Sequence, residues 1–434
     1  TLRTLFPYTT LFRSCDYSRE DEWKRLQKIF ANPSLSMVSF TITEKGYSLN
    51  NISREDVEDG IKHPRSVIAK VASLMYERYK TGELPIALVS MDNCSHNGEK
   101  LYKAINSIVE KWANNGLVEK GFLKYINSPN KVSFPWSMID KITPRPSESV
   151  KNTLNLTGFD STDIVITKGN TYIAPFVNAE GPQYLVLEDS FPNGRMELEK
   201  AGVFFTDRET VERVEKMKVC TCLNPLHTAL AIFGCLLGFN LIADEMKDPA
   251  LKKLVDNIGY IEGMPVVVDP KIFNPEDFIK EVIEVRLPNP YIPDTPQRIV
   301  SDTSQKIGIR FGETIKSYIE REDLDPKNLK YIPLAIAGWC RYLMAVDDNG
   351  EKMELSPDPL LNTLKPYVSE IKLSSGEKVG NKLKTILSNE EIFGVNLYTV
   401  GLGEKVENYF NEMITSTGAV RSTLEKYLNL TKRS

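Results

Sequence analysis

The sequence predicts an α/β domain followed by a mostly α-helical domain. Strand-like and helical patterns alternate in the first half of the chain, whereas from about residue 205 apolar residues recur at helical spacing. A chain of 434 residues is also too long for one ordinary hydrophobic core, which indicates two domains. We expect the α/β domain to span residues 15–205 and the helical domain to span residues 206–434.

The first half opens with two predicted strand–helix pairs. Residues 36–42 alternate in polarity and predict a strand, and residues 66–80 repeat apolar side chains at helical spacing. Residues 85–93 predict a buried strand that runs into a loop, and residues 98–116 predict a helix with Gly116 at its end. This alternation predicts that the strands pair in parallel.

Further strands and then the helical half follow. Three more strands are expected at residues 162–168, 171–177 and 183–189. The helical half begins over residues 206–218, where Thr206 or Asp207 can cap the helix. A second helix is expected to begin with Asn224 as N-cap and Pro225 as first helical residue. Further amphipathic stretches fill residues 240–283, 303–323, 327–346 and 405–430.

Composition and charge exclude several classes of protein. Hydrophobic residues at 41% and charged residues at 26% are typical of a globular chain, and a net charge of −4 argues against a nucleic-acid partner. The longest apolar run, residues 225–239, is interrupted by His227 and Thr228 and is too short to span a membrane. Six dispersed cysteines and three histidines indicate neither a zinc site nor a disulfide framework. We expect a cytoplasmic protein that uses no metal and binds no membrane.

Residues 1–14 (TLRTLFPYTTLFRS) differ in character from the rest of the chain. They contain no acid, and Arg3 and Arg13 are their only charged residues. Pro7 and the residues after it break the apolar core that a secretory signal requires, and two arginines are too few to line a transit-peptide helix. The stretch instead resembles the translation of a common sequencing adapter. We therefore expect a non-native leader that is not packed on the core.

The α/β half lacks the sequence signature of a dinucleotide site. Such ligands bind at the carboxyl ends of parallel strands, over a G-x-G-x-x-G turn that follows the first strand. The only G-x-G of the chain, at residues 401–403, lacks the third glycine and lies in the helical half. Either the protein binds no dinucleotide, or its first βαβ unit is missing from this chain.

Residues 90–101 (SMDNCSHNGEKL) gather polar side chains where a predicted strand runs into a loop. This loop contains Asp92, Asn93, His96 and Asn97, at the kind of place where α/β folds hold reactive groups. An Asx-turn ahead of a helix, with Asn-Gly as the turn, explains the same residues without a function. Both interpretations stay open on these residues alone.

Residues 214–231 (VEKMKVCTCLNPLHTALA) are the most informative stretch. Lys218, Asn224 and His227 flank a join between two helices, so an amine, an amide and an imidazole can converge there. Burial lowers the pKa of a lysine because it disfavours the charged form, and the amine can then act as a general base. Asn224 could donate to a developing alkoxide, and His227 could hold a substrate hydroxyl. The alternative is a solvent-facing helix with a capping asparagine.

Two other stretches contain charged residues beside turn-forming ones. In NPYIPDTPQRIVSDTSQKIGIRFGET, Arg298, Lys306 and Arg310 could clamp a carboxylate or polyhydroxy substrate, or could belong to a solvated helix start. In VSFPWSMIDKITPRP, Asp140 is followed by a lysine, and a surface pair explains the two residues when they are taken alone.

Taken together, these stretches resemble a known family. The order and wording of TITEKGY, SMDNCSHNG, SFPWSMIDKITP, LEDSFPNGR, EKMK, LNPLHTALA and RIVSDTSQK are similar to the polyol-specific long-chain dehydrogenases, which include mannitol dehydrogenase, fructuronate reductase and tagaturonate reductase. The matches cover most of residues 36–310. The resemblance implies an N-terminally truncated Rossmann-like domain, a helical catalytic domain, and metal-independent hydride transfer with NAD, with NADP left open.

The resemblance also implies roles for individual residues. Lys218 is the implied general base, Asn97 and Asn224 are the implied amides of an oxyanion hole, and His227 orients the substrate oxygen. Glu215, three residues before Lys218, matches a glutamate near the proton path of the base. The other implied contacts are those of Asp140, Arg298 and Lys306 with the substrate, and those of Thr43, Glu44, Asp92 and Asn93 with the cofactor.

One spacing departs from the family pattern. The family places its asparagine five residues after the lysine, whereas Lys218 and Asn224 are six residues apart. We expect the extra residue to be absorbed as a bulge or loosened turn before Asn224. Otherwise Lys216 is the alternative base, although it lies farther from the asparagine and lacks a glutamate three residues before it.

The resemblance implies a reaction on sugar acids or polyols. Interconversion of D-fructuronate and D-mannonate is our first hypothesis, because Arg298 and Lys306 suit a sugar acid. Mannitol 2-dehydrogenase and tagaturonate reductase activities are alternatives, since mannitol enzymes have similar cations. An alternative of another class is an inactive fragment that binds its ligand without turning it over. The expected partner is a small-molecule substrate, and the expected state is a monomer or dimer.

Overall fold

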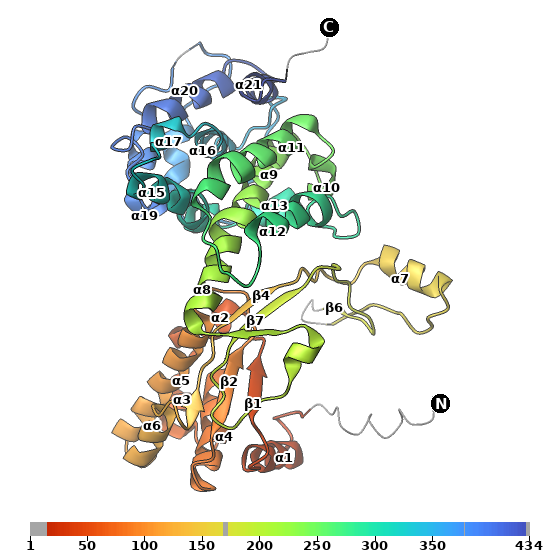
Figure 1. The fold of residues 1–434 in the computed structure, drawn as a ribbon, viewed down its shortest axis with the longest axis vertical. Helices are drawn as coiled ribbons and strands as arrows, with labels where there is room; N and C mark the ends of the chain where they lie inside the picture. Colours follow the sequence, from red (N-terminus) through yellow and green to blue (C-terminus); the bar gives the residue numbers. More distant parts are fainter. Residues whose placement is uncertain (1–14, 168–171, 377, 431–434) are drawn as a thin grey trace. The chain divides into compact units, whose positions relative to one another are not determined.

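The computed structural model describes residues 15–167, 172–376 and 378–430. It divides into two compact units, and Figure 1 labels many of their helices and strands. The first unit comprises the chain up to Asp140 together with Gln183–Glu212, and the second comprises Lys141–Pro182 and Arg213–Ser434. The expected leader at residues 1–14, and Lys168 and Thr171 at the ends of two predicted strands, lie outside the described residues.

A parallel sheet forms the centre of the first unit. Its strands lie in the order β1 (Met37–Phe40), β2 (Ile86–Ser90) and β3 (Val132–Ser133), and both neighbouring pairs are parallel. The helices of this unit are α1 (Glu20–Phe30), α2 (Thr43–Gly46), α3 (Arg54–Asp59), α4 (Val67–Lys80), α5 (Asn97–Asn114) and α6 (Lys120–Ile126), with 3-10 turns at Leu49–Asn51 and Leu198–Ala201. The predicted parallel pairing and the predicted helices α4 and α5 are confirmed.

Strand β2 is buried on both faces, as its continuous apolar run predicts. On one face, Ile86 and Leu88 belong to the core cluster that includes residues of α4 and α5. On the other face, Ala87 and Val89 pack with Leu187 of a second sheet. Figure 1 shows α4 and α5 beside the strands of this unit. The parallel sheet is therefore covered by helices on one side and by strands on the other.

The second sheet contains β4 (Ser137–Asp140), β7 (Tyr184–Glu188) and β8 (Phe204–Thr206), with β4 antiparallel and β8 parallel to β7. The strand expected at 183–189 is thus confirmed as β7. The strands expected at 162–168 and 171–177 shrink to a two-residue pair, β5 (Val165–Ile166) and β6 (Tyr172–Ile173), in the second unit. Their apolar side chains meet no covering layer, since Val165 and Ile173 are more than half exposed.

The rest of the second unit is helical, which confirms the predicted change of architecture. Its α-helices after α8 (Arg208–Lys216) are α9 (Asn224–Leu236), α10 (Ile242–Glu245), α11 (Pro249–Asp256), α12 (Pro275–Glu281), α13 (Pro296–Ile299), α14 (Thr303–Ile307), α15 (Glu313–Glu320), α16 (Tyr331–Tyr342), α17 (Leu361–Val368), α18 (Lys384–Leu387), α19 (Glu390–Phe393), α20 (Gly403–Met413) and α21 (Ala419–Tyr427). Helix α7 (Glu148–Leu156) belongs to the same unit.

Wide π-helical turns interrupt the long helical stretches that the sequence predicts. They lie at Met217–Cys222, Asn257–Gly263, Val282–Arg286 and Gly308–Gly312, and 3-10 turns lie at Met264–Val266 and Pro326–Asn328. Residues 303–323 thus form α14, a π-turn and α15 rather than one helix. Residues 405–430 divide into α20 and α21, since Gly418 adopts a positive φ of 75° between them.

Helix α9 is the core of the second unit. Nearly all its side chains are buried, and it packs against α10, α11, α13 and α16. The helical stretch Arg208–Leu236 is long and apolar enough to cross a bilayer by composition, but 78% of its most apolar window is buried inside the fold. Burial on all sides explains the apolar sequence of α9 as that of a core helix.

The start of α9 corrects one prediction. Leu223 rather than Asn224 occupies the N-cap, and Asn224 is the first helical residue. The reason is that the preceding π-turn runs directly into α9, so the backbone N–H of His227 already bonds the Leu223 carbonyl at 3.0 Å. Of the two caps proposed for α8, Asp207 accepts a hydrogen bond from the Thr210 N–H at 2.8 Å.

Candidate active site

The loops at the carboxyl ends of β1 and β2 are joined by one carboxylate. Asp92, just after β2, accepts hydrogen bonds from the backbone N–H groups of Ile42 at 3.0 Å and Thr43 at 2.9 Å, and from the Tyr47 hydroxyl. Thr43 has a positive φ of 61°, a conformation that a threonine adopts only when its surroundings impose it. The predicted residues Thr43 and Asp92 therefore lie together at the edge where α/β folds bind nucleotides.

The other two predicted cofactor residues lie on the same edge with exposed side chains. Glu44 forms an ion pair with Lys100 of α5 at 2.5 Å, and Asn93 follows Asp92 in the loop. An exposed pair of this kind adds little stability. Glu44 and Asn93 are therefore placed where they could meet a ligand of the sheet edge.

Asn97 is buried at the start of α5, and its amide is fully engaged. Its Nδ2 donates to the Asp92 carbonyl at 3.0 Å and to the carbonyl and hydroxyl oxygens of Ser137 at 2.9 and 2.8 Å. Gly98 permits this close approach, because a Cβ there would lie 2.5 Å from the Phe134 carbonyl oxygen. Asn97 thus fastens α5 to β4 in this structure, and it would have to release these bonds to contact a substrate. Asp140, also predicted, is buried at the end of β4.

In the second unit, Lys218 lies in a π-turn between α8 and α9. The turn spans Met217–Cys222, and the Leu223 N–H bonds the Lys218 carbonyl at 3.0 Å, five residues back. A π-turn accommodates one more residue than an α-turn, so the expected loosened turn between Lys218 and Asn224 is present. Lys218 is 2% exposed, whereas Lys216 lies at the surface. Lys218 is thus the buried member of the pair of candidate bases, and Lys216 is the exposed one.

Three other predicted residues lie close to Lys218 in the sequence, one before it and two after it. Glu215 is half-buried in the last turn of α8, and Asn224 and His227 lie one turn apart on α9, on the same face. The side-chain amide of Asn224 makes no hydrogen bond within the described part of the chain. It is therefore available to donate to a ligand.

One buried carboxylate joins His227 to Arg298. Asp294 is 5% exposed, its two oxygens accept from Nε and Nη2 of Arg298 at 2.6 and 2.7 Å, and its Oδ2 lies 3.3 Å from Nε2 of His227. Burial alone would raise the pKa of Asp294, but these two partners outweigh it and lower the pKa to about 2. Burial lowers the pKa of His227, an effect that Asp294 opposes and that Arg310 and Arg298 increase. The group is therefore an ionised carboxylate between a guanidinium and an imidazole.

Lys306 and Arg310 extend this cationic region. The Lys306 amine donates to the Ser301 carbonyl at 2.9 Å, and burial and then the charge of Arg310 lower its pKa. The Arg310 guanidinium donates to the Thr228 hydroxyl at 2.5 Å and forms no ion pair among the described residues; burial lowers its pKa to about 10. Because Arg310 has no acidic partner among the described residues, this region suits an anionic ligand.

The structure thus brings together some of the predicted residues. Asp92 and Thr43 touch within the first unit, and Asp294 joins His227 and Arg298 within the second. Sequence reasoning missed Asp294 because it stands among prolines and a threonine that indicate only a turn. An acid four residues before Arg298 was the available signal, since such pairs face each other on a helix.

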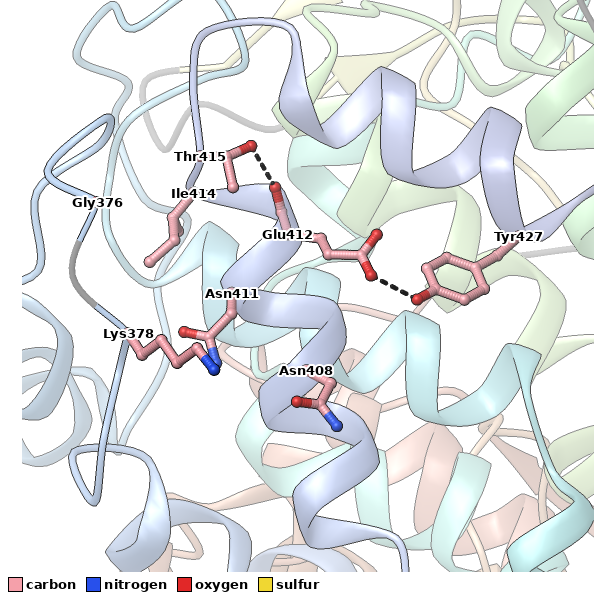
Figure 2. A pocket seen from close by; sticks show the side chains of 8 residues that line it. All are labelled: Gly376, Lys378, Asn408, Asn411, Glu412, Ile414, Thr415 and Tyr427. Atoms are coloured by element: carbon pink, nitrogen blue, oxygen red, sulfur yellow. Dashed lines mark hydrogen bonds between the residues drawn. The ribbon is translucent and has the colours of Figure 1, made fainter.

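A separate cavity lies in the second unit, as Figure 2 shows. Its volume is about 500 Å³, and none of the predicted site residues lines it. Its acid, Glu412, already accepts hydrogen bonds from Lys426 at 2.8 Å and from Tyr427 at 2.6 Å. The one acid among its described lining residues is therefore engaged by other side chains.

Parallel strands with polar loops at their carboxyl edge, followed by a helical unit with a buried lysine just before its core helix, are the features expected of a two-domain dehydrogenase. Models of known families agree with this class. Residues 11–200 match the mannitol dehydrogenase Rossmann domain, and residues 210–414 match the mannitol dehydrogenase C-terminal domain. The chain belongs to the mannitol dehydrogenase family and is an oxidoreductase.

Individual relatives support the same assignment. The chain is 60% identical over 414 residues to D-mannonate oxidoreductase of Thermotoga maritima, a match that covers 93% of this chain and 76% of the relative. It is 29% identical to mannitol 2-dehydrogenase of Aspergillus clavatus, over 92% of this chain and 75% of the relative. Among solved structures, mannitol 2-dehydrogenase of Pseudomonas fluorescens in complex with NAD and D-mannitol matches with a TM-score of 0.67 and 26% identity, over 95% of this chain and 78% of that chain.

Proposed function

We propose that this protein interconverts D-mannonate and D-fructuronate by hydride transfer with NAD. The observation that supports this choice most is the 60% identity to a D-mannonate oxidoreductase, compared with 29% to a mannitol 2-dehydrogenase over a similar share of the chain. The proposal includes an expected cytoplasmic location, a monomer or dimer, and a domain boundary near residue 206.

The cationic region of the helical unit supports a sugar acid as substrate. Arg298 bonds Asp294 through Nε and Nη2, so its Nη1 takes no part in these two bonds. Arg310 forms no ion pair among the described residues. Lys306 lies 3.9 Å from its nearest acid, Asp302. A substrate carboxylate would compensate this positive charge, whereas an uncharged polyol would not.

We propose Lys218 as the general base of the reaction. In the oxidation direction, its neutral amine would take the hydroxyl proton of the substrate while hydride leaves the same carbon. Asn224 would donate a hydrogen bond to the oxygen on which charge develops, and His227 would hold a substrate hydroxyl. Glu215 would lie on the path by which the proton leaves Lys218. Asn97 would share the role of Asn224 only after releasing Ser137.

The sheet edge of the first unit fits the cofactor that this chemistry needs. When bound, NAD supplies the acceptor for the hydride. Asp92 already binds two backbone N–H groups of the facing loop, so we propose that it shapes the edge, while Thr43, Glu44 and Asn93 contact the cofactor. The assays with NADH and NADPH described below distinguish NAD from NADP as the cofactor.

Kinetic assays with three substrates test the proposal. Reduction of D-fructuronate, D-tagaturonate and D-fructose would be compared with NADH and with NADPH. We expect kcat/KM for D-fructuronate with NADH to exceed the other values, because its carboxylate meets the cationic region. Equal or faster turnover of D-fructose would refute the choice of substrate. A preference for D-tagaturonate would indicate a tagaturonate reductase instead.

Replacement of Lys218 tests the mechanism. In Lys218→Ala, kcat should fall by roughly 10²- to 10⁴-fold, the usual contribution of a positioned acid–base group, while NADH still binds. Lys216→Ala is the matched control, since it removes the same kind of side chain from the surface two residues away. Activity near that of the wild type in Lys218→Ala would remove this residue from the mechanism.

A further inference from the structure

We propose that Asp294 is a positioning residue, which fixes the tautomer of His227 and the orientation of Arg298 toward the substrate. The inference rests on the proposed function, because it takes both partners as substrate contacts. Its basis is the single buried carboxylate that reaches both of them, at 3.3 Å from Nε2 of His227 and in two short bonds to Arg298.

The contact defines which nitrogen of His227 has the proton. A carboxylate accepts hydrogen bonds only, so the nitrogen that faces Asp294 must be an N–H. Nε2 is buried and lies 3.3 Å from Oδ2 of Asp294, a contact too poorly aligned for a regular hydrogen bond, and no other described residue bonds it. In the neutral imidazole this leaves Nδ1 without a proton, as the nitrogen that can accept a hydrogen bond from a substrate hydroxyl.

The same carboxylate holds Arg298 side-on. Its bonds engage Nε and Nη2, which leaves Nη1 for a ligand, and the side chain is 64% exposed beyond this anchor. The contact with His227, at 3.3 Å, is longer than the two bonds to Arg298 and less well aligned, and it uses the same Oδ2 that accepts from Nη2 of Arg298. Asp294 therefore couples the two contacts, and its loss should disturb both at once.

The decisive measurement is the tautomer of His227, observed by NMR of protein labelled with ¹⁵N only in histidine. The chain has three histidines, and His63 and His96 are assigned by replacing each with glutamine. Wild-type His227 should show an unprotonated Nδ1 and a protonated Nε2. In Asp294→Asn this pattern should be lost, because the new amide can donate to Nε2. An Nδ1–H tautomer in the wild type would overturn the proposal without the need for any variant to fold.

The pKa of His227, measured from the same signals, separates positioning from a merely structural role. The charged groups that face the imidazole are Asp294, Arg298 and Arg310. Removing the carboxylate leaves only cations, so the pKa of His227 should fall in Asp294→Asn. Asp244→Asn, a loss of the same charge from an exposed pair on α10, should leave this pKa unchanged. An unchanged pKa in Asp294→Asn would contradict the proposal.

Kinetics complete the test. We expect kcat for D-fructuronate to fall roughly 100-fold in Asp294→Asn. Replacing the aspartate that orients the histidine of a serine protease lowers kcat by ~10⁴-fold, and we expect a smaller loss here because His227 does not itself transfer the proton. Asp294→Glu, which restores an acceptor, should recover part of this loss. Wild-type kcat in Asp294→Asn would overturn the positioning role. Failure of the wild type to act on D-fructuronate would instead refute the proposed function. The tautomer measurement would still test whether Asp294 sets the protonation of His227.

Discussion

Glu245, at the end of α10, is a buried acid whose replacement should change the pH dependence of stability. Its side chain is fully buried against Gly234 of α9, and neither carboxyl oxygen has a hydrogen-bond partner among the described residues. Burial raises its pKa from 4.5 to about 9, and the nearby charges of Asp294 and Asp248 add to the rise. Glu245 is therefore protonated in the folded protein at neutral pH.

The sign and size of the effect follow from proton linkage. Below pH 4.5 the carboxyl is protonated in both the folded and the unfolded state, so folding requires no proton uptake. Between pH 4.5 and about 9 only the folded state binds the proton, and stability falls as pH rises. The slope is about 1.4 kcal/mol per pH unit, which amounts to roughly 3 kcal/mol between pH 6 and pH 8. Glutamine has the same shape without this titration, so Glu245→Gln should abolish the slope.

Hydrogen exchange of the α9 amides measures this effect, because α9 is the helix that Glu245 touches. The opening free energy of α9, corrected for intrinsic exchange, would be determined at pH 6 and pH 8 for the wild type and for Glu245→Gln. Subtracting the pH profile of the variant from that of the wild type removes the contribution of groups that titrate alike in both proteins. We expect the wild type to lose roughly 3 kcal/mol more than the variant over this range. Parallel pH profiles for the two proteins would show that Glu245 is ionised or solvated in the fold and would refute the reasoning.

Three further substitutions test the packing of the helical unit. Gly234→Ala would place a Cβ 1.9 Å from the Glu245 carboxyl, so thermal melting should show a loss of about 1–3 kcal/mol. Arg286→Met leaves Glu180 buried and unpaired where both side chains are 0% exposed; urea unfolding should show a loss of about 3–5 kcal/mol, which replacing Glu180 by leucine as well should largely restore. Glu262→Gln weakens the side-chain cap of α16, whose Tyr331 and Ile332 N–H groups bond this carboxylate at 2.9 and 2.7 Å. Exchange of these amides should speed up by a factor equivalent to about 1–2 kcal/mol.

Local sequence patterns predicted correctly those strands whose apolar faces are covered by other parts of the fold. The alternation at 36–42 and the apolar run at 85–93 gave strands β1 and β2, because their side chains have a covering layer on the faces that the pattern indicates. The same kind of pattern at 162–168 failed. Its apolar residues Val165 and Ile166 are more than half exposed among the described residues, and a β-rich sequence without a covering layer forms only the short pair β5–β6.

The candidate site was predictable where one residue's chemistry suffices and unpredictable where a partner decides. A lysine six residues before an asparagine suggested a loosened turn, and the π-turn at Met217–Cys222 provides it. The engagement of Asn97 by Ser137, forty residues away, left no trace in the local sequence. For Asp294 the local sequence showed only its pairing with Arg298, four residues on, and not its contact with His227, which is distant along the chain.

Two buried acids near α9, Asp294 and Glu245, differ in ionisation because their interaction partners differ, although both are buried. Asp294 meets a guanidinium and an imidazole, and its pKa falls to about 2, whereas Glu245 has no cation as a partner among the described residues and its pKa rises to about 9. A second ionised carboxylate beside Asp294 would disfavour the negative charge of Asp294. The neutrality of Glu245 therefore helps Asp294 to stay ionised, which is the state in which it can accept a hydrogen bond from Nε2 of His227.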